Sequence, residues 1–245
     1  MWLLQRIDPF SLISHLNIIA TVGGGGKTTL AEYLAARAFQ QGRRTVITTT
    51  TKMRAEAPYL LVDDLEGKGR NLASSNQEGP LRIGKALADG KLTSLSFDEI
   101  EGLEGTFDFI VIEADGAKGR PLKLPSAHEP VIPPFSDQTI LVAGLDGLGG
   151  PVADHVFRWE LFQDMAGVPG DALIDSTLFA TLFGARAMMK DIDPAKCTIM
   201  LNKFDACRER EKVIPLAKRL VRSTGVGRVI ISSLLFRFFY SVSEV

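Results

Sequence analysis

The sequence of 245 residues is poor in cysteine and histidine. Its two cysteines, Cys197 and Cys207, are too few for a disulfide framework. The 3 histidines are scattered along the chain, and no pair of histidines or cysteines has the short spacing that chelates a tetrahedral metal ion. We therefore do not expect a metallochaperone that carries nickel or zinc on its own side chains.

The sequence also lacks an excess of charge of either sign and any long hydrophobic run. Lys and Arg number 28 against 29 for Asp and Glu, whereas a duplex-binding domain usually carries a basic excess. No apolar run reaches the roughly 18 residues that span a membrane. Residues 1–16 lack the apolar core and cleavage site of a secretory signal. We expect a cytoplasmic protein without nucleic-acid or membrane partners.

What remains is an ordinary globular composition, with 45 % hydrophobic and 23 % charged residues. Residues 17–22 form an apolar, β-branched run, and a run of glycines follows it. Residues 27–41 are rich in Ala, Leu and Glu, and residues 45–51 are again β-branched. This order predicts a strand, a glycine loop, a helix and a second strand, which together make one βαβ unit.

The rest of the chain continues the alternation of strands and helices less evenly. We read residues 55–106 as a less regular, insertion-like stretch, and residues 115–137 as a proline-rich loop too polar for the core. Strands alternating with helices predict a mostly parallel sheet covered on both faces. Further strands are predicted at 107–114, 138–143, 197–201 and 228–233, and helices at 8–16, 96–103, 153–166, 177–189 and 208–223.

The run Gly23-Gly24-Gly25-Gly26-Lys27-Thr28-Thr29 stands between the first strand and its helix. Glycines let the backbone wrap around an anion, and the N–H groups of a helix N-terminus point at phosphate oxygens. In a P-loop the lysine reaches the β- and γ-phosphates, and the next hydroxyl binds Mg²⁺. The strict pattern needs glycine at position 21, where this chain has Thr21, so the match is to a GGxGKT variant. A flexible glycine turn is the alternative.

This loop, placed between a strand and a helix, sets the fold prediction. We predict an α/β fold with a doubly wound, mostly parallel sheet of the P-loop NTPase type. A single nucleotide-binding domain is expected to span residues 1–245. The expected ligands are GTP or ATP with Mg²⁺.

Glu113 and Asp115 stand at the carboxyl end of the strand predicted at 107–114. Ligands of open α/β sheets bind beyond the carboxyl ends of the strands. A carboxylate there holds Mg²⁺ or orients an attacking water. We expect Thr28 together with Glu113 or Asp115 at the metal, and the sequence does not choose between the two acids. Residues 48–51, four threonines, either approach the metal or simply favour a strand.

Asn202-Lys203-Phe204-Asp205 directly follows the strand predicted at 197–201, and resembles the guanine-specificity motif N-K-x-D of GTPases. An aspartate there accepts from guanine N1–H and from the exocyclic amine, a donor pair that adenine lacks. We expect Asn202, Lys203 and Asp205 to select the base, which favours GTP over ATP. The alternative is a polar turn after a strand.

A basic segment follows the acidic strand end. Lys118, Arg120, Lys123, His128 and Glu129 lie on a loop stiffened by prolines, beside the predicted γ-phosphate. Such a loop is suited to bind a second anionic substrate or to stabilise charge in a transition state. The alternative is a solvated charged loop.

At this point the chain resembles a known family, the selenium-dependent hydroxylase accessory proteins, or selenium cofactor biosynthesis proteins, of the YqeC type. The resemblance spans most of the chain, and its most specific part lies at residues 113–133. It implies a P-loop nucleotide-binding protein that assists maturation of selenium-dependent molybdenum hydroxylases, a pathway rather than a mechanism. The residues that carry it are GGGGKTT at 23–29, TTTTKM at 48–53, EADGAKGRPLK at 113–123, HEPVIP at 128–133, VFRWE at 156–160 and NKFD at 202–205.

These observations lead to one functional prediction and two alternatives. We expect Mg²⁺-dependent binding and hydrolysis of GTP, or of ATP, with Lys27, Glu113 and Asp115 as the catalytic residues. The expected partners are a molybdenum hydroxylase or its cofactor-maturation enzymes, and a homodimer is compatible with the fold. One alternative is an ATP-dependent transferase or ligase that activates a small anionic substrate. The other is a nucleotide-switched binding module without significant turnover.

Overall fold

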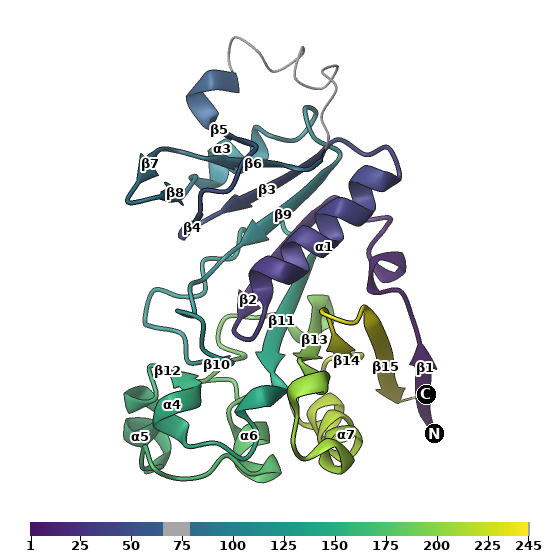
Figure 1. The fold of residues 1–245 in the computed structure, drawn as a ribbon, viewed down its shortest axis with the longest axis vertical. Coiled ribbons are helices and arrows are strands. Elements are labelled where there is room, and N and C mark those ends of the chain that lie inside the picture. The colour runs from purple at the N-terminus through teal and green to yellow at the C-terminus, as the bar shows by residue number, and fades with distance from the viewer. Residues whose placement is uncertain (66–78, 245) are drawn as a thin grey trace.

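The computed structural model describes residues 1–65 and 79–244. In this part of the chain a ten-stranded sheet runs through the molecule (Figure 1). The pairs at its C-terminal edge are antiparallel and the other pairs are parallel, so the predicted doubly wound, mostly parallel sheet is confirmed. In spatial order the strands are β1 (Trp2–Arg6), β15 (Phe238–Glu244), β14 (Val229–Ser233), β13 (Cys197–Asn202), β11 (Gln138–Gly144), β2 (Ile18–Gly23), β9 (Phe109–Glu113), β3 (Thr45–Thr49), β6 (Leu81–Gly84) and β5 (Tyr59–Leu61).

The predicted βαβ unit forms the centre of the sheet. β2 leads through the glycine loop into α1 (Lys27–Gln40), and the chain returns as β3. β2 and β3 are buried along their whole length, as expected for parallel strands covered on both faces. α1 buries Leu30, Leu34 and Ala38 against one face of the sheet, where Phe109 of β9 lies in the same core cluster.

The opposite face of the sheet carries α7 (Val213–Thr224) and a group of short helices. α7 is amphipathic, and it buries Leu216 and Leu220 in the second core cluster of the described residues. The short helices are α3 (Phe97–Glu101), α4 (Val152–His155), α5 (Glu160–Ala166) and α6 (Ser176–Thr181). Figure 1 shows α4, α5, α6 and α7 gathered beyond the lower ends of the central strands, whereas α3 lies at the upper end of the molecule, beside β5 and β6.

Four helix predictions differ from the structure. The helix predicted at 153–166 is divided into α4 and α5, because β12 (Val156–Phe157) pairs with β10 (Leu122–Lys123) instead of continuing the helix. The helix predicted at 177–189 ends at Thr181, where turns packed into the core follow. The one predicted at 208–223 begins only at Val213. The one predicted at 8–16 is a short 3₁₀-helix, η1 (Pro9–Leu12).

The loop predicted at 115–137 is not too polar for the core. It contains β10, and the side chains of Leu122 and Leu124 are fully buried. Within the stretch predicted as irregular, β7 (Leu87–Ala88) and β8 (Lys91–Thr93) form a small antiparallel sheet with β4 (Lys52–Arg54), which lies just before that stretch. Residues 66–78 of that stretch lie outside the described residues. In residues 1–65 and 79–244, no helix has the length and apolar content required to cross a membrane.

Candidate functional site

The glycine loop between β2 and α1 packs closely against the end of β11. Gly23 and Gly25 have φ angles of 95° and 73°, which side-chain-bearing residues rarely adopt. A Cβ atom at Gly23 would lie 2.2 Å from the carbonyl oxygen of Val142, and one at Gly25 would lie 2.3 Å from the nitrogen of Gly144. Only glycine therefore fits either position. Thr21, where the strict motif has glycine, is a buried residue inside β2, so the departure from the motif lies in the strand.

The N-terminus of α1 carries no capping side chain, because its N-cap residue is Gly26. The first four N–H groups of a helix have no partner within the helix, and they carry the positive end of its dipole. α1 is 14 residues long, and its first turn lines a cavity. Uncapped N–H groups beside a lysine and a hydroxyl group fit the phosphates of a nucleotide.

Asp115 connects the glycine loop to two lysines inside the protein. Its Oδ2 accepts a hydrogen bond of 2.9 Å from the N–H group of Gly23. Lys27 Nζ lies 3.0 Å from Asp115 Oδ1 and also donates to the carbonyl oxygen of Gly23. Lys123 Nζ lies 2.9 Å from Asp115 Oδ2. All three charged side chains are buried, so Asp115 fixes both the loop and its lysine.

The charge chain continues from Lys123 through Glu129 to Arg158. Glu129 Oε2 lies 3.0 Å from Lys123 Nζ and accepts a hydrogen bond from the Arg158 guanidinium. Burial lowers the pKa of Lys123, although both carboxylates oppose this change. Burial by itself would raise the pKa of Glu129, but the hydrogen bonds from Arg158 and Lys123 hold it at about 2. A continuous set of ion pairs therefore joins the glycine loop to Arg158 at the cavity wall.

Glu113, not Asp115, lies beside the hydroxyl group of the P-loop threonine. Thr28 Oγ1 donates to Glu113 Oε2 at 3.2 Å. Burial raises the pKa of Glu113, and the charge of Lys27 offsets part of this rise. A hydroxyl and a carboxylate are hard oxygen ligands of the kind that Mg²⁺ accepts together with substrate phosphates. These two side chains therefore fit a magnesium ion bound with a nucleotide.

The four threonines at the end of β3 and directly after it mainly bind neighbouring backbone groups. The hydroxyl groups of Thr48, Thr49 and Thr50 donate to backbone carbonyl groups of β6, of β9 and of the loop that follows β10, at 2.9, 2.7 and 2.6 Å. Thr51 is the member of this run that lines the cavity. The run thus joins β3 to the segments on either side of it.

Asn202, at the end of β13, contacts the glycine loop directly. Its Nδ2 donates to the carbonyl oxygen of Gly25 at 2.9 Å, and its Oδ1 accepts from the N–H group of Leu234 at 3.0 Å. The side chain is buried. Its amide is therefore occupied by backbone groups on both sides, which is the arrangement of a positioning residue.

The other two residues of the N-K-x-D motif also have partners. Lys203 lines the cavity, and its Nζ lies 2.7 Å from Asp146 Oδ2. Asp205 Oδ1 accepts a hydrogen bond from the hydroxyl group of Ser233, the last residue of β14. Lys203 and Asp205 thus stand on the same side of the glycine loop as β13.

The five residues expected on a basic substrate loop divide into two pairs and a single residue. Lys118 and Arg120 line the cavity. Lys123 and Glu129 belong to the buried charge chain, and His128 is exposed and does not line the cavity. Lys123 is buried and Glu129 is half-buried, because the loop folds back as β10 against β12. Of the five residues, Lys118 and Arg120 are therefore the ones that a second substrate in the cavity could contact.

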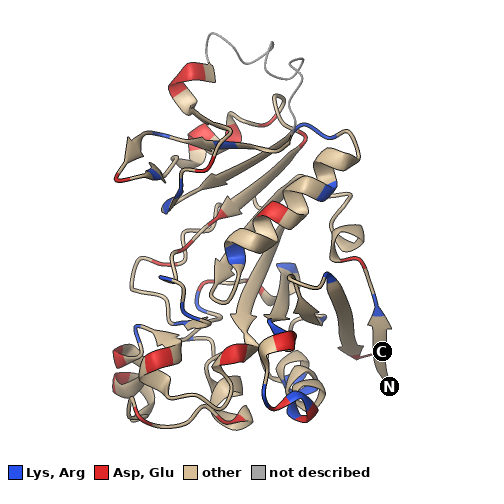
Figure 2. Cartoon of the chain, in the orientation of Figure 1, with Lys and Arg blue, Asp and Glu red and all other residues tan. Residues whose placement is uncertain are grey.

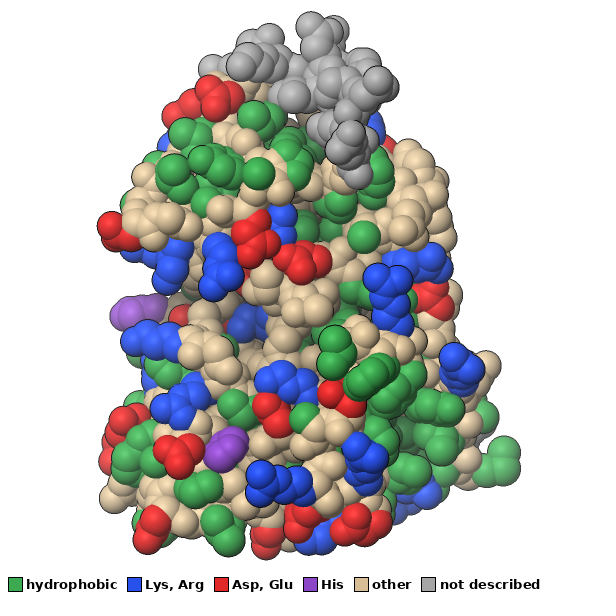
Figure 3. Space-filling model, in the orientation of Figure 1, with side chains coloured by type: hydrophobic (Ala, Val, Ile, Leu, Met, Phe, Trp, Pro, Cys, Tyr) green, Lys and Arg blue, Asp and Glu red, His purple; other side chains and the backbone are tan. Residues whose placement is uncertain are grey.

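A cavity of about 630 Å³ opens in front of the P-loop. Sequence reasoning missed three of its cations, on β4 and β8, although the alternation of a strand places residues 52 and 54 on one face. Figure 2 shows Lys and Arg on β4, on the first turn of α1 and on the loop below them, and in Figure 3 such side chains gather between the upper and lower parts of this face. The charged side chains lining the cavity are Lys27, Lys52, Arg54, Lys91, Glu113, Asp115, Lys118, Arg120, Arg158 and Lys203.

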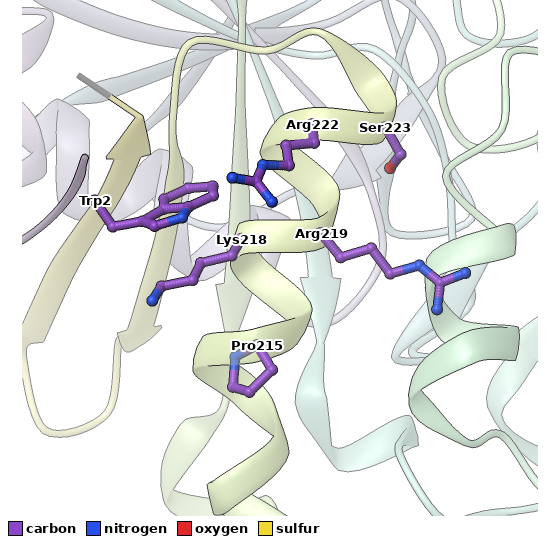
Figure 4. Close-up of a pocket in the computed structure, with 6 residues that line it drawn as sticks. All are labelled: Trp2, Pro215, Lys218, Arg219, Arg222 and Ser223. Atoms are coloured by element: carbon purple, nitrogen blue, oxygen red, sulfur yellow. The ribbon is translucent and has the colours of Figure 1, made fainter.

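A second hollow, between β1 and α7, has a structural explanation (Figure 4). Lys218 Nζ and the guanidinium carbon of Arg222 lie 5.4 and 4.9 Å from the centre of the Trp2 ring. Arg219 points away from the ring (Figure 4). These contacts hold the first strand against α7, and we assign this hollow no ligand.

Comparison with known proteins gives relatives by sequence and neighbours by fold. YqeC of Escherichia coli strain K12 is 32 % identical over 242 residues, which cover 91 % of this chain and 94 % of that protein. FtsY of Mycoplasma mycoides and FlhF complexed with GMPPNP and Mg²⁺ are each 16 % identical, with TM-scores of 0.39 and 0.40. The match to FtsY covers 87 % of this chain and 60 % of the FtsY chain, and the match to FlhF covers 88 % of this chain and 66 % of the FlhF chain.

Residues 19–160, which contain the glycine loop, Glu113 and the buried charge chain, match the family described as YqeC protein. Most of the segments that carry the resemblance in the sequence contribute residues to the lining of one cavity. Together with the P-loop fold, they support a nucleotide-binding protein. By this match and by its identity to the Escherichia coli protein, the chain belongs to the YqeC family.

Proposed function

We propose that this protein binds a nucleoside triphosphate with Mg²⁺ and hydrolyses it. The observation that carries the proposal is the uncapped N-terminus of α1, with Lys27 and Thr28 in its first turn and Glu113 beside Thr28. Backbone N–H groups, a lysine, a hydroxyl and a carboxylate are the groups that nucleotide phosphates and Mg²⁺ require.

In this proposal water attacks the γ-phosphorus, and the bond to the oxygen bridging the β- and γ-phosphates breaks. Nucleoside diphosphate and inorganic phosphate are the products. The helix N-terminus and Lys27 hold the phosphate oxygens, and Thr28 and Glu113 hold the metal, which neutralises phosphate charge when bound. Asp115, held by two lysines, positions the glycine loop and Lys27.

We further propose that the nucleotide is GTP, and that Asp205 accepts hydrogen bonds from guanine while Lys203 packs against the base. The location of both residues after β13, beside the glycine loop, supports this assignment. Family membership supports a role in the cytoplasm as an accessory factor in maturation of selenium-dependent molybdenum hydroxylases. The hydroxylase partner and a homodimer belong to the same proposal.

Equilibrium binding of GTP and ATP with Mg²⁺ tests the nucleotide site. Lys27→Ala should weaken the binding of both nucleotides at least ~10-fold, because a charge-assisted contact to phosphate contributes about 1.5–3 kcal/mol. Lys218→Ala, on α7 and outside the cavity, is the control for loss of one positive charge. Nucleotide affinity that is unchanged in Lys27→Ala would contradict the site.

Base selection is tested with Asp205→Ala. The wild type should bind GTP at least ~10-fold more tightly than ATP, a difference of about 1.4 kcal/mol. The variant should lose that preference while retaining affinity for ATP. Asp171→Ala removes an exposed aspartate elsewhere and should keep the preference. Equal binding of both nucleotides by the wild type would show that the motif does not select guanine.

Metal binding is tested with Glu113→Gln. The amide retains an acceptor for Thr28 but loses the charge that binds a cation, so the Mg²⁺ concentration needed for half-maximal nucleotide binding should rise ~10-fold or more. Because burial raises the pKa of Glu113, its ionisation opposes folding at neutral pH. The unfolding midpoint of the ligand-free variant should therefore equal or exceed that of the wild type. A lower midpoint with unchanged Mg²⁺ dependence would contradict a metal role.

A second candidate function, an ATP-dependent transferase or ligase, is favoured by the excess of cations in the cavity. A transferase yields a modified acceptor, whereas hydrolysis yields only nucleoside diphosphate and inorganic phosphate. Phosphorus NMR of the products with candidate anionic acceptors distinguishes the two.

A further inference from the structure

We infer that the cationic face of β4 and β8 binds a second, multiply anionic small molecule of the phosphate class, beside the nucleotide. We call this face, formed by Lys52, Arg54 and Lys91, the β4–β8 face. The inference deepens the proposed function and rests on it, because it names the class of the co-ligand at the same cavity.

The alternation of β4 separates its charged and apolar side chains. Lys52 and Arg54 are exposed, whereas Met53 between them is buried and lies opposite Leu92, which is fully buried. Successive side chains of a strand point to opposite faces. The apolar side of this small sheet therefore packs on the protein, and its cationic side faces the cavity.

The β4–β8 face places like charges together. Arg54 is the direct cross-strand partner of Lys91 in an antiparallel pair, an arrangement that is destabilising for like charges. Arg54 Nη1 lies 3.7 Å from Oε1 of the half-buried Glu56, whose other oxygen pairs with Arg82. Neither Lys52 nor Lys91 forms an ion pair with any described residue. An anion bound between the strands would relieve this repulsion.

The position of this face separates it from the predicted base site. β2, which leads into the P-loop, has β11 and then β13 on one side and β9 and then β3 on the other. β4 begins three residues after β3 ends, whereas Lys203 and Asp205 follow β13. The β4–β8 face therefore stands on the side of Glu113 and Thr28, where the terminal phosphate of the nucleotide is proposed to lie.

The opposite wall of the same cavity adds two more cations. Lys118 and Arg120 line it and form no ion pair with any described residue, and Lys118 Nζ lies 5.3 Å from the centre of the Phe157 ring. In the proposed function the helix N-terminus and Lys27 bind the triphosphate, and Glu113 binds its Mg²⁺. The five cations of the two walls thus remain for a further ligand. A concave cavity of about 630 Å³ has the size of a small-molecule site rather than that of a nucleic-acid surface.

The test uses the full chain loaded with a fluorescent, non-hydrolysable GTP analogue and excess Mg²⁺. Inorganic pyrophosphate is the probe, titrated by calorimetry while fluorescence reports whether the nucleotide stays bound. The variant is Arg54→Gln/Lys91→Gln. Its matched control is Lys218→Gln/Arg219→Gln, which removes one lysine and one arginine from α7, outside the cavity.

We expect pyrophosphate to bind the loaded wild type without displacing the analogue. Affinity for pyrophosphate should fall at least ~10-fold in Arg54→Gln/Lys91→Gln and stay within about twofold in the control, while affinity for the analogue is unchanged in both. Without ligand, the unfolding midpoint of Arg54→Gln/Lys91→Gln should equal or exceed that of the wild type, because the variant removes the like-charge pair.

Three results would overturn the inference and leave the proposed function standing. These are no pyrophosphate binding to the loaded protein, displacement of the analogue by pyrophosphate, or an equal loss of analogue affinity in the variant. If the wild type binds no nucleotide, the proposed function fails instead. Pyrophosphate is then titrated into the nucleotide-free protein. If Arg54→Gln/Lys91→Gln weakens pyrophosphate binding and Lys27→Ala does not, the inferred anion site stands. If only Lys27→Ala weakens pyrophosphate binding, the inferred site is wrong.

Discussion

Lys123 shows how a buried charge is used at the scale of single residues. Its side chain is 0 % exposed, and its Nζ lies within 3.0 Å of two carboxylates, those of Asp115 and Glu129. A buried charge is tolerated when it is paired, and removing one partner is costly. The pairs connect the glycine loop to Arg158, so they determine where the cavity wall lies relative to the P-loop.

Glu129 gives this charge chain a measurable pH dependence. Its pKa in the folded protein is about 2, against an ordinary value of 4.5, so its ionisation stabilises the fold by about 3 kcal/mol above pH 4.5. That contribution is lost as the pH falls toward 2. Glu129→Gln should therefore lower the free energy of unfolding by about 3 kcal/mol at pH 7, and the difference from the wild type should be roughly halved near pH 3.

Urea unfolding of both proteins at pH 7 and near pH 3 measures this difference. Glu101→Gln, an exposed glutamate of α3, is the matched control and should differ little from the wild type at either pH. A deficit of Glu129→Gln that is the same at both pH values would contradict the ionised charge chain.

At the scale of elements, the P-loop is held by neighbouring elements as much as by its own glycines. β11 crowds Gly23 and Gly25, the loop before β10 accepts the N–H group of Gly25, and Asn202 of β13 donates to the carbonyl oxygen of Gly25. The loop is therefore organised by the packing around it, which is the preorganisation that anion binding requires.

Asn202→Ala tests this arrangement. It leaves the carbonyl oxygen of Gly25 and the N–H group of Leu234 without their partner, which should cost about 1–3 kcal/mol of stability. Because the loop serves any nucleotide, affinities for GTP and ATP should fall together. Unfolding and nucleotide titrations, with Asp205→Ala for comparison, measure both effects. A loss confined to GTP would assign Asn202 to the base instead.

At the scale of the whole molecule, the two ends of the chain close one edge of the sheet. β1 pairs with β15 along its whole length, and β15 pairs with β14, so both termini lie at the edge remote from the cavity (Figure 1). Trp2 attaches this edge to α7 through Lys218 and Arg222. Stability at this edge should therefore be separable from ligand binding.

Trp2→Ala should lower the free energy of unfolding by about 2 kcal/mol, because it removes two cation–π contacts and the packing of a partly buried ring. Nucleotide affinity should not change. Chemical denaturation and nucleotide titration provide the two readouts. Leu3→Ala, at an exposed site on the same strand, should cost less than about 0.5 kcal/mol. An altered nucleotide affinity in Trp2→Ala would show that the edge and the cavity are coupled.

The sequence predicted the elements whose formation depends on a local residue pattern, and it failed for elements and side chains whose position depends on partners far along the chain. The alternation of apolar runs identified β2, α1 and β3, because periodicity and glycine freedom are local properties. It predicted one helix over 153–166, because no local signal shows that Val156 and Phe157 pair with β10. Lys123 was expected on a polar substrate-binding loop for a similar reason, since its two carboxylate partners come from other parts of the folded loop.

The sequence by itself determined the α/β alternation, the glycine loop before α1 and the family, because these depend on residue order and on backbone freedom. Only the tertiary structure decided that Glu113 and not Asp115 lies beside Thr28, and that Asn202 contacts the glycine loop. It also brought the β4–β8 face to the cavity of the P-loop. These outcomes depend on distances between segments far apart in the chain, which are set only when the strands pack in their spatial order.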